Sequence, residues 1–408
     1  MNILFLSTEN PYPPDHGHHL RTYNVMRCLA ARHNLYFVGF ATAPDAVAER
    51  ELAQFCMDVK IFLQPAAGRW NWRFYLALGM NLFSPLPFSV KKYFRKDVAK
   101  YISHVVEKNK IDLVHVDMLH LGIYHPYFKN FPNLLVNHNV ESLALLRKAK
   151  IFRNPLAKAY LFLQYQKLQV FEKKTLPLFD VNVVVSGHDQ AVLQRRVPSG
   201  RYEIIPNGVD VDYFVPGEKT TKAKEIIWVG GMKDMDNRDA VDYSLKRIWP
   251  FIIEQVPDVK ITFVGKAPTK RLRKAAGRSA NVSFTGYVAD VRPFVDKALV
   301  FIAPLRSGGG TKLKVLNAMA MAKAVVTTTI GAEGIHAKNE EHFFVADDCK
   351  MFADHVIHLL SNPGRAVEVG KKARQFVEEH YDWRTIGELM ERICQRVYAS
   401  TVNMQTLV

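Results

Sequence analysis

The sequence predicts an α/β protein built from two doubly wound, Rossmann-like domains. Short apolar runs alternate with longer helical patterns in both halves, which is typical of crossover units in a mainly parallel sheet. The length of 408 residues fits two domains, and 48% hydrophobic residues can supply two cores. A stretch rich in Pro, Gly and charge, 197–224, separates the halves.

The first half contains six apolar runs that we interpret as strands. They lie at 3–6, 35–40, 59–63, 113–116, 134–136 and 181–185. A strand-like run at 202–205 then leads into the linker sequence Pro206-Asn-Gly-Val-Asp210. We therefore expect an N-terminal domain over residues 1–200.

The second half repeats the alternation. Its expected strands lie at 226–229, 261–264, 282–284, 299–303, 325–328 and 343–345, with helices at 240–255 and 311–321 among others. This predicts a C-terminal domain over 201–382, with a last helix, about 383–408, that packs back on the first domain. Doubly wound sheets bind ligands at the carboxyl ends of their strands, so two such domains would face each other across a cleft.

The cysteine spacing, the first residues and the length of the apolar runs indicate where in the cell the protein is expected. The four cysteines lie far apart without metal-ligand spacing, which fits a reducing cytosol. Residues 1–7 lack the charged n-region of a signal peptide and fit a first strand instead. No run approaches the roughly 20 apolar residues of a membrane span. We expect a cytoplasmic protein that is soluble or bound peripherally to the inner face of the cytoplasmic membrane.

The net charge of +16 is concentrated in two segments that also carry aromatic residues. Segment 68–101 has seven Lys or Arg and one Asp, and segment 147–174 has eight and one Glu. Within 94–105 the apolar residues share one helical face, which predicts a basic amphipathic helix for an anionic membrane surface. The alternative is a helix that faces the core. Nucleic acid is excluded as a partner because no recognition module is present.

Residues 301–320 carry the clearest signal for a ligand. An apolar strand ends at three consecutive glycines, 308–310, and a periodic helix begins near Thr311. Bare amides at a helix N-terminus bind phosphate or diphosphate, and three cations lie beside them. These cations are Arg306, Lys312 and Lys314. The spacing is neither that of a Walker loop nor GxGxxG, and the alternative is a loop that only needs positive φ.

Five elements in order resemble the motifs of glycosyltransferase family 4, whose members have the GT-B fold. They are STENPYPPDHGHHLR at 7–21, Asn137-His-Asn-Val-Glu-Ser142, Ile205-Pro-Asn-Gly-Val-Asp210, WVGGM at 228–232 with Asn237, and GGGTKLK at 308–314 with Gly331-Ala-Glu-Gly334. The resemblance extends over nearly the whole chain and is greatest to a bacterial subgroup associated with exopolysaccharide synthesis. It implies a retaining transfer of sugar from a UDP- or GDP-linked donor to a glycan acceptor, which we expect to be lipid-linked.

The resemblance also implies residue roles. His138 and Glu141 would be catalytic, and Arg21 and His115 would lie on the acceptor or donor-sugar side. The donor would be held by Gly17, Gly230, Lys233, Asn237, Arg306, Gly308, Gly309, Gly310, Thr311, Lys314, Asn317 and Glu333. Neither a metal nor a cofactor is implied, because the cations and the helix N-terminus would offset the charge of the leaving diphosphate. The pair Asp210 and Asp212 matches a metal-binding DxD only formally, and His16, His18 and His19 lack further ligands at suitable spacing.

Four positions depart from the family pattern. Gly309 and Asn317 stand where glutamates are usual, Gly231 replaces an arginine, and His18 replaces a glycine. Two alternatives therefore stay open: a nucleotide-sugar epimerase of the same fold, and a catalytically silent binding protein of a polysaccharide assembly. Individual residues have structural alternatives too. His138 can fix a loop, Glu141 can cap the following helix or orient His138, and Glu333 can belong to a tight turn.

Overall fold

The computed structural model describes residues 1–14, 17–64, 72–152, 154–217, 224–266, 268–277, 279–308 and 310–405. The chain divides into two compact units. The N-terminal unit comprises Met1–Ile205 together with Ile386–Val408, and the C-terminal unit comprises Pro206–Thr385. The limits expected from the sequence, 200 and 382, lie close to these divisions.

The N-terminal unit contains a parallel sheet of seven strands in the order β3-β2-β1-β4-β5-β6-β7. The strands are β1 (Asn2–Ser7), β2 (Asn34–Ala41), β3 (Cys56–Leu63), β4 (Leu113–Asp117), β5 (Asn133–Asn137), β6 (Val181–Val184) and β7 (Tyr202–Ile204). The central strands are buried, as continuous apolar runs require in a sheet covered on both faces. The order reverses between β1 and β4, where Ser7 pairs with Asp117. Ligands bind at this kind of reversal in open α/β sheets.

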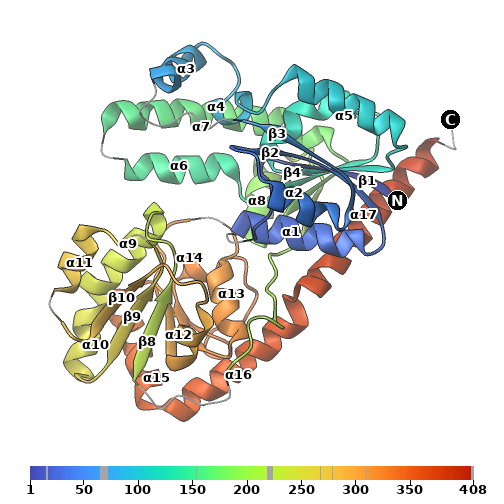
Figure 1. Cartoon of the computed structure of the whole chain (residues 1–408). Helices are drawn as coiled ribbons and strands as arrows, with labels where there is room; N and C mark the ends of the chain where they lie inside the picture. The colour runs from blue at the N-terminus through green and yellow to red at the C-terminus, as the bar shows by residue number, and fades with distance from the viewer. Residues whose placement is uncertain are drawn as a thin grey trace. The chain divides into compact units, whose positions relative to one another are not determined.

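Helices cover this sheet and extend beyond it (Figure 1). They are α1 (Gly17–Ala30), α2 (Ala46–Ala53), α3 (Trp72–Leu82), α4 (Phe88–Lys91), α5 (Lys96–Lys108), η1 (Leu119–Tyr127), α6 (Glu141–Ile151), α7 (Pro155–Thr175), η2 (Leu176–Leu178) and α8 (Gly187–Arg196). The last helix, α17 (Trp383–Gln405), joins the unit from Ile386 onward, where Arg32 Nη1 donates to Glu391 Oε2 at 2.7 Å. Next to α7, Asn81 of α3 accepts from Gln164 at 2.8 Å.

The apolar face of α5 packs into the core. Val98, Ala99, Ile102, Val105 and Val106 are all buried there, and the basic side chains are solvated. The apolar face of 94–105 is therefore turned to the core, as the alternative held, and contact of its basic face with a membrane stays a prediction. Both arrangements need the same amphipathic pattern, so the sequence could not separate them.

The C-terminal unit contains a parallel sheet of six strands in the order β10-β9-β8-β11-β12-β13, again with a reversal, here between β8 and β11. The strands are β8 (Glu225–Val229), β9 (Lys260–Val264), β10 (Val282–Gly286), β11 (Val300–Ala303), β12 (Ala324–Thr327) and β13 (Phe344–Val345). Buried side chains fill both faces of this sheet, with Trp228 and Phe263 in one cluster and Ile227 and Phe301 in the other.

Its helices are α9 (Met235–Tyr243), η3 (Ser244–Ile248), α10 (Trp249–Gln255), α11 (Lys270–Ala276), α12 (Arg292–Lys297), α13 (Leu313–Ala320), α14 (Thr329–Ala332), α15 (Cys349–Ser361) and α16 (Pro363–His380). The single helix expected over 240–255 is interrupted by the π-helical η3. The break precedes Pro250, which has no N–H to continue the hydrogen-bond ladder. In the part of the chain described here, no helix combines the length and apolar character that a membrane crossing requires.

Candidate active site

Lys314 is the centre of a polar cluster in the C-terminal unit. It lies in the first turn of α13, close to the carboxyl end of β8. Its Nζ donates to Asn237 Oδ1 at 2.6 Å and lies 4.6 Å from the ring centroid of the buried Trp228. Asn237 is fixed in turn by donating to the Gly231 carbonyl at 2.9 Å. Burial of the amine lowers the pKa of Lys314 to about 8.

Glycine is required at two positions around this amine. A Cβ on Gly230 would lie 2.7 Å from Lys314 Nζ and 2.8 Å from the Trp228 ring. Gly308 has φ +112°, a conformation that L side chains rarely adopt. The backbone at these two glycines therefore carries no side chain, which permits a ligand to approach it closely.

The loop before α13 is tied to α9. Ser307 Oγ donates to Asp236, and Lys312 Nζ donates to the Gly310 carbonyl at 2.8 Å. The helix begins at Leu313 and not at Thr311, and the N-cap residue Lys312 gives no side-chain cap. The first turn of α13 thus has no side-chain cap, although the Val315 amide donates to the Lys312 carbonyl at 2.9 Å, and an uncapped helix N-terminus is suited to an anion. Gly309 lies outside the described residues.

Arg306 is already engaged by a carboxylate. Its Nε and Nη2 donate to Asp239 at 3.0 and 2.6 Å, and the guanidinium stacks 4.3 Å from the ring centroid of Tyr243. Both aspartates beside the glycine loop, Asp236 and Asp239, were not predicted from the sequence. The acidic run 234–239 could have predicted them, because it contains three aspartates around Asn237.

The other expected donor residues are spread over loops and helices of both units. Lys233 is exposed, and Asn317 is partly buried in the middle of α13. Neither is hydrogen-bonded to Lys314. Glu333 is the C-cap residue of α14, and the buried Thr311 accepts from Asn207 at 3.4 Å through its carbonyl. Gly17, the first residue of α1, is exposed in the N-terminal unit.

The polar centre of the N-terminal unit is Asp117, at the reversal between β1 and β4. Its side chain is 2% exposed. One oxygen, Oδ2, accepts from Thr22 Oγ1 at 2.5 Å and lies 3.2 Å from His18 Nε2, while Oδ1 lies 2.6 Å from His138 Nε2. Burial alone would raise the pKa of Asp117, but His138 and His18 outweigh it and hold the pKa well below the usual value.

Within the described residues, His18, Asp117 and His138 form one group with the composition of a metal site, since their donor atoms all lie within 4.8 Å of one another. The distances argue for hydrogen bonds instead. Ligands that each lie about 2 Å from one zinc ion are roughly 3 Å or more apart, whereas His138 and Asp117 are separated by 2.6 Å. The arrangement is that of a charge-assisted network, and the absence of a metal in the working protein stays a prediction.

Arg21 and His115 lie inside the N-terminal unit, each 1% exposed. Arg21 donates to the Ile205 carbonyl at 2.9 Å. The His115 ring stacks on Phe5 with centroids 4.0 Å apart, and burial lowers the pKa of His115 to about 4. Contact of these two residues with a sugar, as the resemblance implied, has no support from this geometry.

Glu141 begins α6 and is a second carboxyl with unusual surroundings. Burial, followed by the nearby Glu172, raises the pKa of Glu141 to about 7. Glu172 itself is buried and accepts from the backbone and hydroxyl of Ser142 at 3.0 and 2.6 Å. A carboxyl that titrates near neutral pH is typical of acid–base sites, although structural networks produce the same shift.

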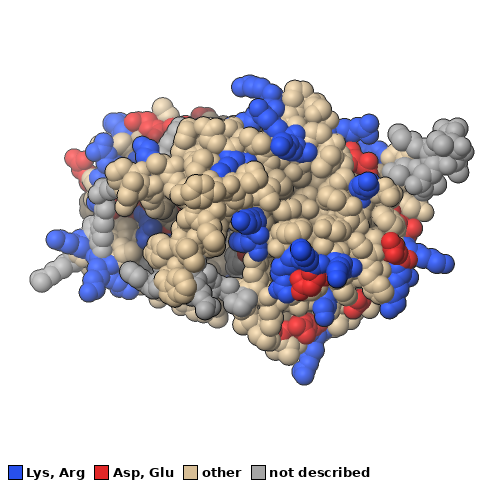
Figure 2. Space-filling view, turned by 90° about the horizontal axis from the view of Figure 1, so that it is seen from above, with Lys and Arg blue, Asp and Glu red and all other residues tan. Residues whose placement is uncertain are grey.

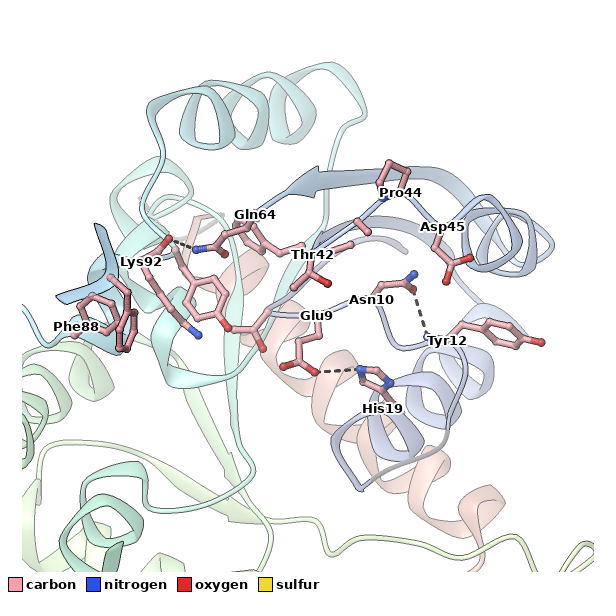
Figure 3. A pocket seen from close by; sticks show the side chains of 16 residues that line it. Glu9, Asn10, Tyr12, His19, Thr42, Pro44, Asp45, Gln64, Phe88 and Lys92 are labelled. Atoms are coloured by element: carbon pink, nitrogen blue, oxygen red, sulfur yellow. Dashed lines mark hydrogen bonds and ion pairs between the residues drawn. The ribbon is translucent and has the colours of Figure 1, made fainter. Parts of the chain in front are cut away.

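A pocket of 690 Å³ opens at the carboxyl ends of β1, β2 and β3 (Figure 3). Polar side chains line part of it, and aromatic rings from α3, α4 and the residues after α4 line another. The polar group includes Glu9, Asn10, Thr42 and Gln64, and the aromatic group includes Phe74, Phe88 and Tyr93. Glu9 lies 3.0 Å from His19 Nε2 and 3.7 Å from His18 Nδ1, which links the pocket to the Asp117 network. This pocket was not predicted from the sequence because its lining residues are scattered over the first hundred positions.

Family models match both units. Residues 17–213 match the model described as Glycosyltransferase Family 4, and residues 223–362 match that described as Glycosyl transferases group 1. A 44.6 kDa uncharacterized protein of the cps region of Klebsiella pneumoniae is 30% identical over 399 residues, covering 94% of this chain and 97% of that protein. The chain belongs to glycosyltransferase family 4.

Other similarities are more distant. The phosphatidyl-myo-inositol mannosyltransferase of Mycobacterium tuberculosis is 28% identical over 217 residues, 49% of this family 4 chain and 56% of that enzyme. Among solved structures, a sucrose-phosphate synthase from Thermosynechococcus elongatus has a TM-score of 0.74 at 18% identity, covering 98% and 100% of the two chains. Anabaena HepE in complex with UDP has a TM-score of 0.65 at 14% identity, covering 97% and 100%. These structures confirm the predicted GT-B fold, and the family membership confirms a glycosyltransferase in the broad sense.

Proposed function

We propose that the chain is a retaining glycosyltransferase that moves a sugar from a nucleotide-sugar donor to a lipid-linked surface glycan. The C-terminal unit binds the donor and the N-terminal unit binds the acceptor. The observation that carries the proposal is the Lys314 cluster at the strand reversal between β8 and β11. In a chain of this family, a cation and bare amides at that place fit a nucleoside diphosphate.

The charge of Lys314 has an amide partner, Asn237, and is favoured electrostatically by Asp234 and Asp236, although none of the ion pairs found among the described residues includes it. A buried cation of this kind attracts an anionic ligand, because a partner of opposite charge offsets the cost of its burial. Two neighbours of the chain support a nucleotide donor: the solved HepE complexes contain UDP or UDP-glucose.

The acceptor fits the pocket of the N-terminal unit. Aromatic faces together with amide, hydroxyl and carboxylate groups make a surface suited to a sugar ring, and 690 Å³ lies in the usual range for a small ligand. The apolar end, with Phe74 and Phe88, continues into α3. A lipid-linked glycan has the matching polarity, and the similar protein of a cps region supports a surface polysaccharide.

Retention would proceed by attack on the same face of the sugar. The bond between the anomeric carbon and the diphosphate breaks, the acceptor oxygen bonds to that carbon, and its proton passes to the departing phosphate oxygen. Lys314 and the amides of α13 offset the charge on the diphosphate, so no divalent ion is needed. Asp210, one half of the formal DxD pair, instead accepts from the amides of Asp212 and Tyr213 at 3.2 and 2.8 Å.

The surface of the N-terminal unit supports the proposal of a peripheral position at the cytoplasmic membrane. Figure 2 shows Lys and Arg in several separate groups on the side that carries α3, α5 and α7. Because the apolar face of α5 packs into the core, the apolar side chains that could contact lipid are those of α3 and of Phe83, the residue after it. Trp72, Tyr75, Leu76, Met80 and Phe83 are 50–92% exposed. Exposed aromatics beside cations fit an anionic lipid surface.

The test is a panel of UDP- and GDP-sugars, screened by thermal stabilisation and then repeated with lipid extract and EDTA. We expect one donor to stabilise the protein and a labelled sugar to move into lipid-linked product. Sugar turnover without lipid would favour an epimerase, and no binding at millimolar nucleotide would favour a silent binding protein. Loss of transfer in EDTA would contradict the metal-free mechanism.

A further inference from the structure

We propose that Asp117 is a positioning residue for the transfer reaction, which holds His138 in the tautomer that accepts a hydrogen bond from a sugar hydroxyl. This inference rests on the proposed function and adds to it a residue that no motif of the family resemblance contains. Its basis is the bridge that the Asp117 carboxylate makes between His18 and His138.

The carboxylate must be ionised in this setting. It is buried, and the three described side chains that hydrogen-bond to it, Thr22, His18 and His138, can each donate a hydrogen. A buried carboxylate persists when charged donors and hydrogen bonds stabilise it. An ionised carboxylate only accepts, so His138 must carry its hydrogen on Nε2. The lone pair of the neutral His138 ring then lies on Nδ1.

His18 differs from His138 because both of its ring nitrogens face carboxylates. Nε2 lies 3.2 Å from Asp117 and Nδ1 lies 3.7 Å from Glu9. Two acceptors favour the doubly protonated imidazolium, and these same contacts raise the pKa of His18 to about 10 although burial opposes them. The two rings meet edge to face with centroids 4.6 Å apart, so a charged His18 disfavours a second charge on His138.

The neighbouring groups agree with this assignment. Arg21 and His115 both interact electrostatically with Asp117, and the cation of Arg21 also disfavours protonation of His138. Burial is the main cause that lowers the pKa of His138 to about 4. On the other side, Glu9 is held by His18 and His19, and Glu9 and His19 line the pocket. Asp117 thus fixes the hydrogen-bonding state of the His138 imidazole, and His18 and Glu9 connect the same network to the pocket.

Asp117→Asn keeps the size of the side chain and removes its charge. An amide presents one donor and one acceptor, so it cannot accept from both imidazoles. We expect kcat to fall by about 100-fold or more, as for loss of a tautomer-fixing carboxylate in other enzymes, while KM for the donor changes less than about threefold. Asp180→Asn is the matched control, because Asp180 accepts from the Asn133 amide at the amino end of β5. That variant should keep wild-type kcat.

Nitrogen NMR of histidine-labelled wild-type protein tests the geometry without any substitution at Asp117. We expect His138 to carry hydrogen on Nε2 alone and His18 to be doubly protonated at pH 7.5, with assignments from His138→Gln and His18→Gln. Hydrogen on Nδ1 of His138, kcat in Asp117→Asn within threefold of wild type, or stoichiometric bound metal would overturn the proposal. If wild-type protein transfers no sugar from any donor, the proposed function is wrong. The positioning role is then rejected with it, even if NMR finds the expected protonation of His138 and His18.

Discussion

Replacing Lys314 with methionine should weaken binding of UDP or GDP by about 10- to 100-fold at pH 7. Methionine keeps an apolar stem over Trp228 and removes only the charge and its hydrogen bonds. A charge-assisted hydrogen bond contributes about 1.5–3 kcal/mol, and 1.4 kcal/mol corresponds to tenfold in affinity. Isothermal titration calorimetry measures the change directly.

Lys323→Met is the matched control for this substitution. Lys323 is also a largely buried lysine of the C-terminal unit with a pKa lowered by burial, and its Nζ donates to the Asp296 carbonyl at 2.9 Å. We expect its nucleotide affinity to stay within twofold of wild type. If Lys314→Met also binds within twofold of wild type, Lys314 does not contact the diphosphate and the donor site proposed here is wrong.

The remaining predictions concern stability and the membrane. Glu141→Gln should raise the free energy of unfolding by on the order of 1–3 kcal/mol at pH 8.5 and leave it unchanged at pH 4. The reason is that Glu141 loses its proton near pH 7 in the folded chain but near pH 4.5 in the unfolded chain, so its charged form destabilises the fold at high pH. Equal effects at both pH values would contradict this. His18→Gln should lower the free energy of unfolding most near pH 6. Its difference from wild type should shrink as pH rises from 6.5 through about 10, where folded His18 loses its proton. Chemical denaturation at pH 6 and pH 10 measures this, and a constant difference between variant and wild type would count against the ion pairs. Replacing Trp72 and Phe83 by serine should lower partitioning onto anionic vesicles by about tenfold, whereas Met57→Ser, an exposed apolar residue on β3, should not change it.

The central strands of both units were predictable because they are buried on both faces. That burial requires short continuous apolar runs, such as 113–116 and 299–303, and the observed β4 and β11 differ from these by only a residue at one end. The helix at 240–255 was harder, since a local pattern does not reveal a π-helical turn. The orientation of α5 could not be predicted, because packing against a core and contact with lipid select the same periodicity.

The site was predictable only where its residues are adjacent in sequence. The glycine loop and Lys314 lie within seven positions of one another, and together they predict an anion site. Arg306 and Asp239 are 67 positions apart, and His18 and Asp117 are 99 apart. Such pairs depend on which strands become neighbours in the sheet. The lone aspartate that ends an apolar run at Asp117 was a usable signal, because polar residues at the carboxyl ends of central strands point to ligand sites.

The two clusters differ in how their charges are balanced, and this difference predicts a proton uptake. In the N-terminal unit, Asp117 is matched by His18 and further donors, so a neutral sugar needs no change of charge there. In the C-terminal unit, Lys314 has a pKa of about 8 and an amide partner. A bound diphosphate would stabilise its charged form and raise that pKa.

At pH 8.5, binding of UDP or GDP should therefore draw about three-quarters of a proton from the buffer, because only about a quarter of the free lysine is charged at that pH. Calorimetry in two buffers of different ionisation enthalpy reads this number directly. Lys314→Met should show no uptake, while Lys323→Met should match wild type. An uptake that persists in Lys314→Met would mean that another group faces the phosphates, and a wild-type enthalpy independent of buffer would mean that the amine is far from the ligand.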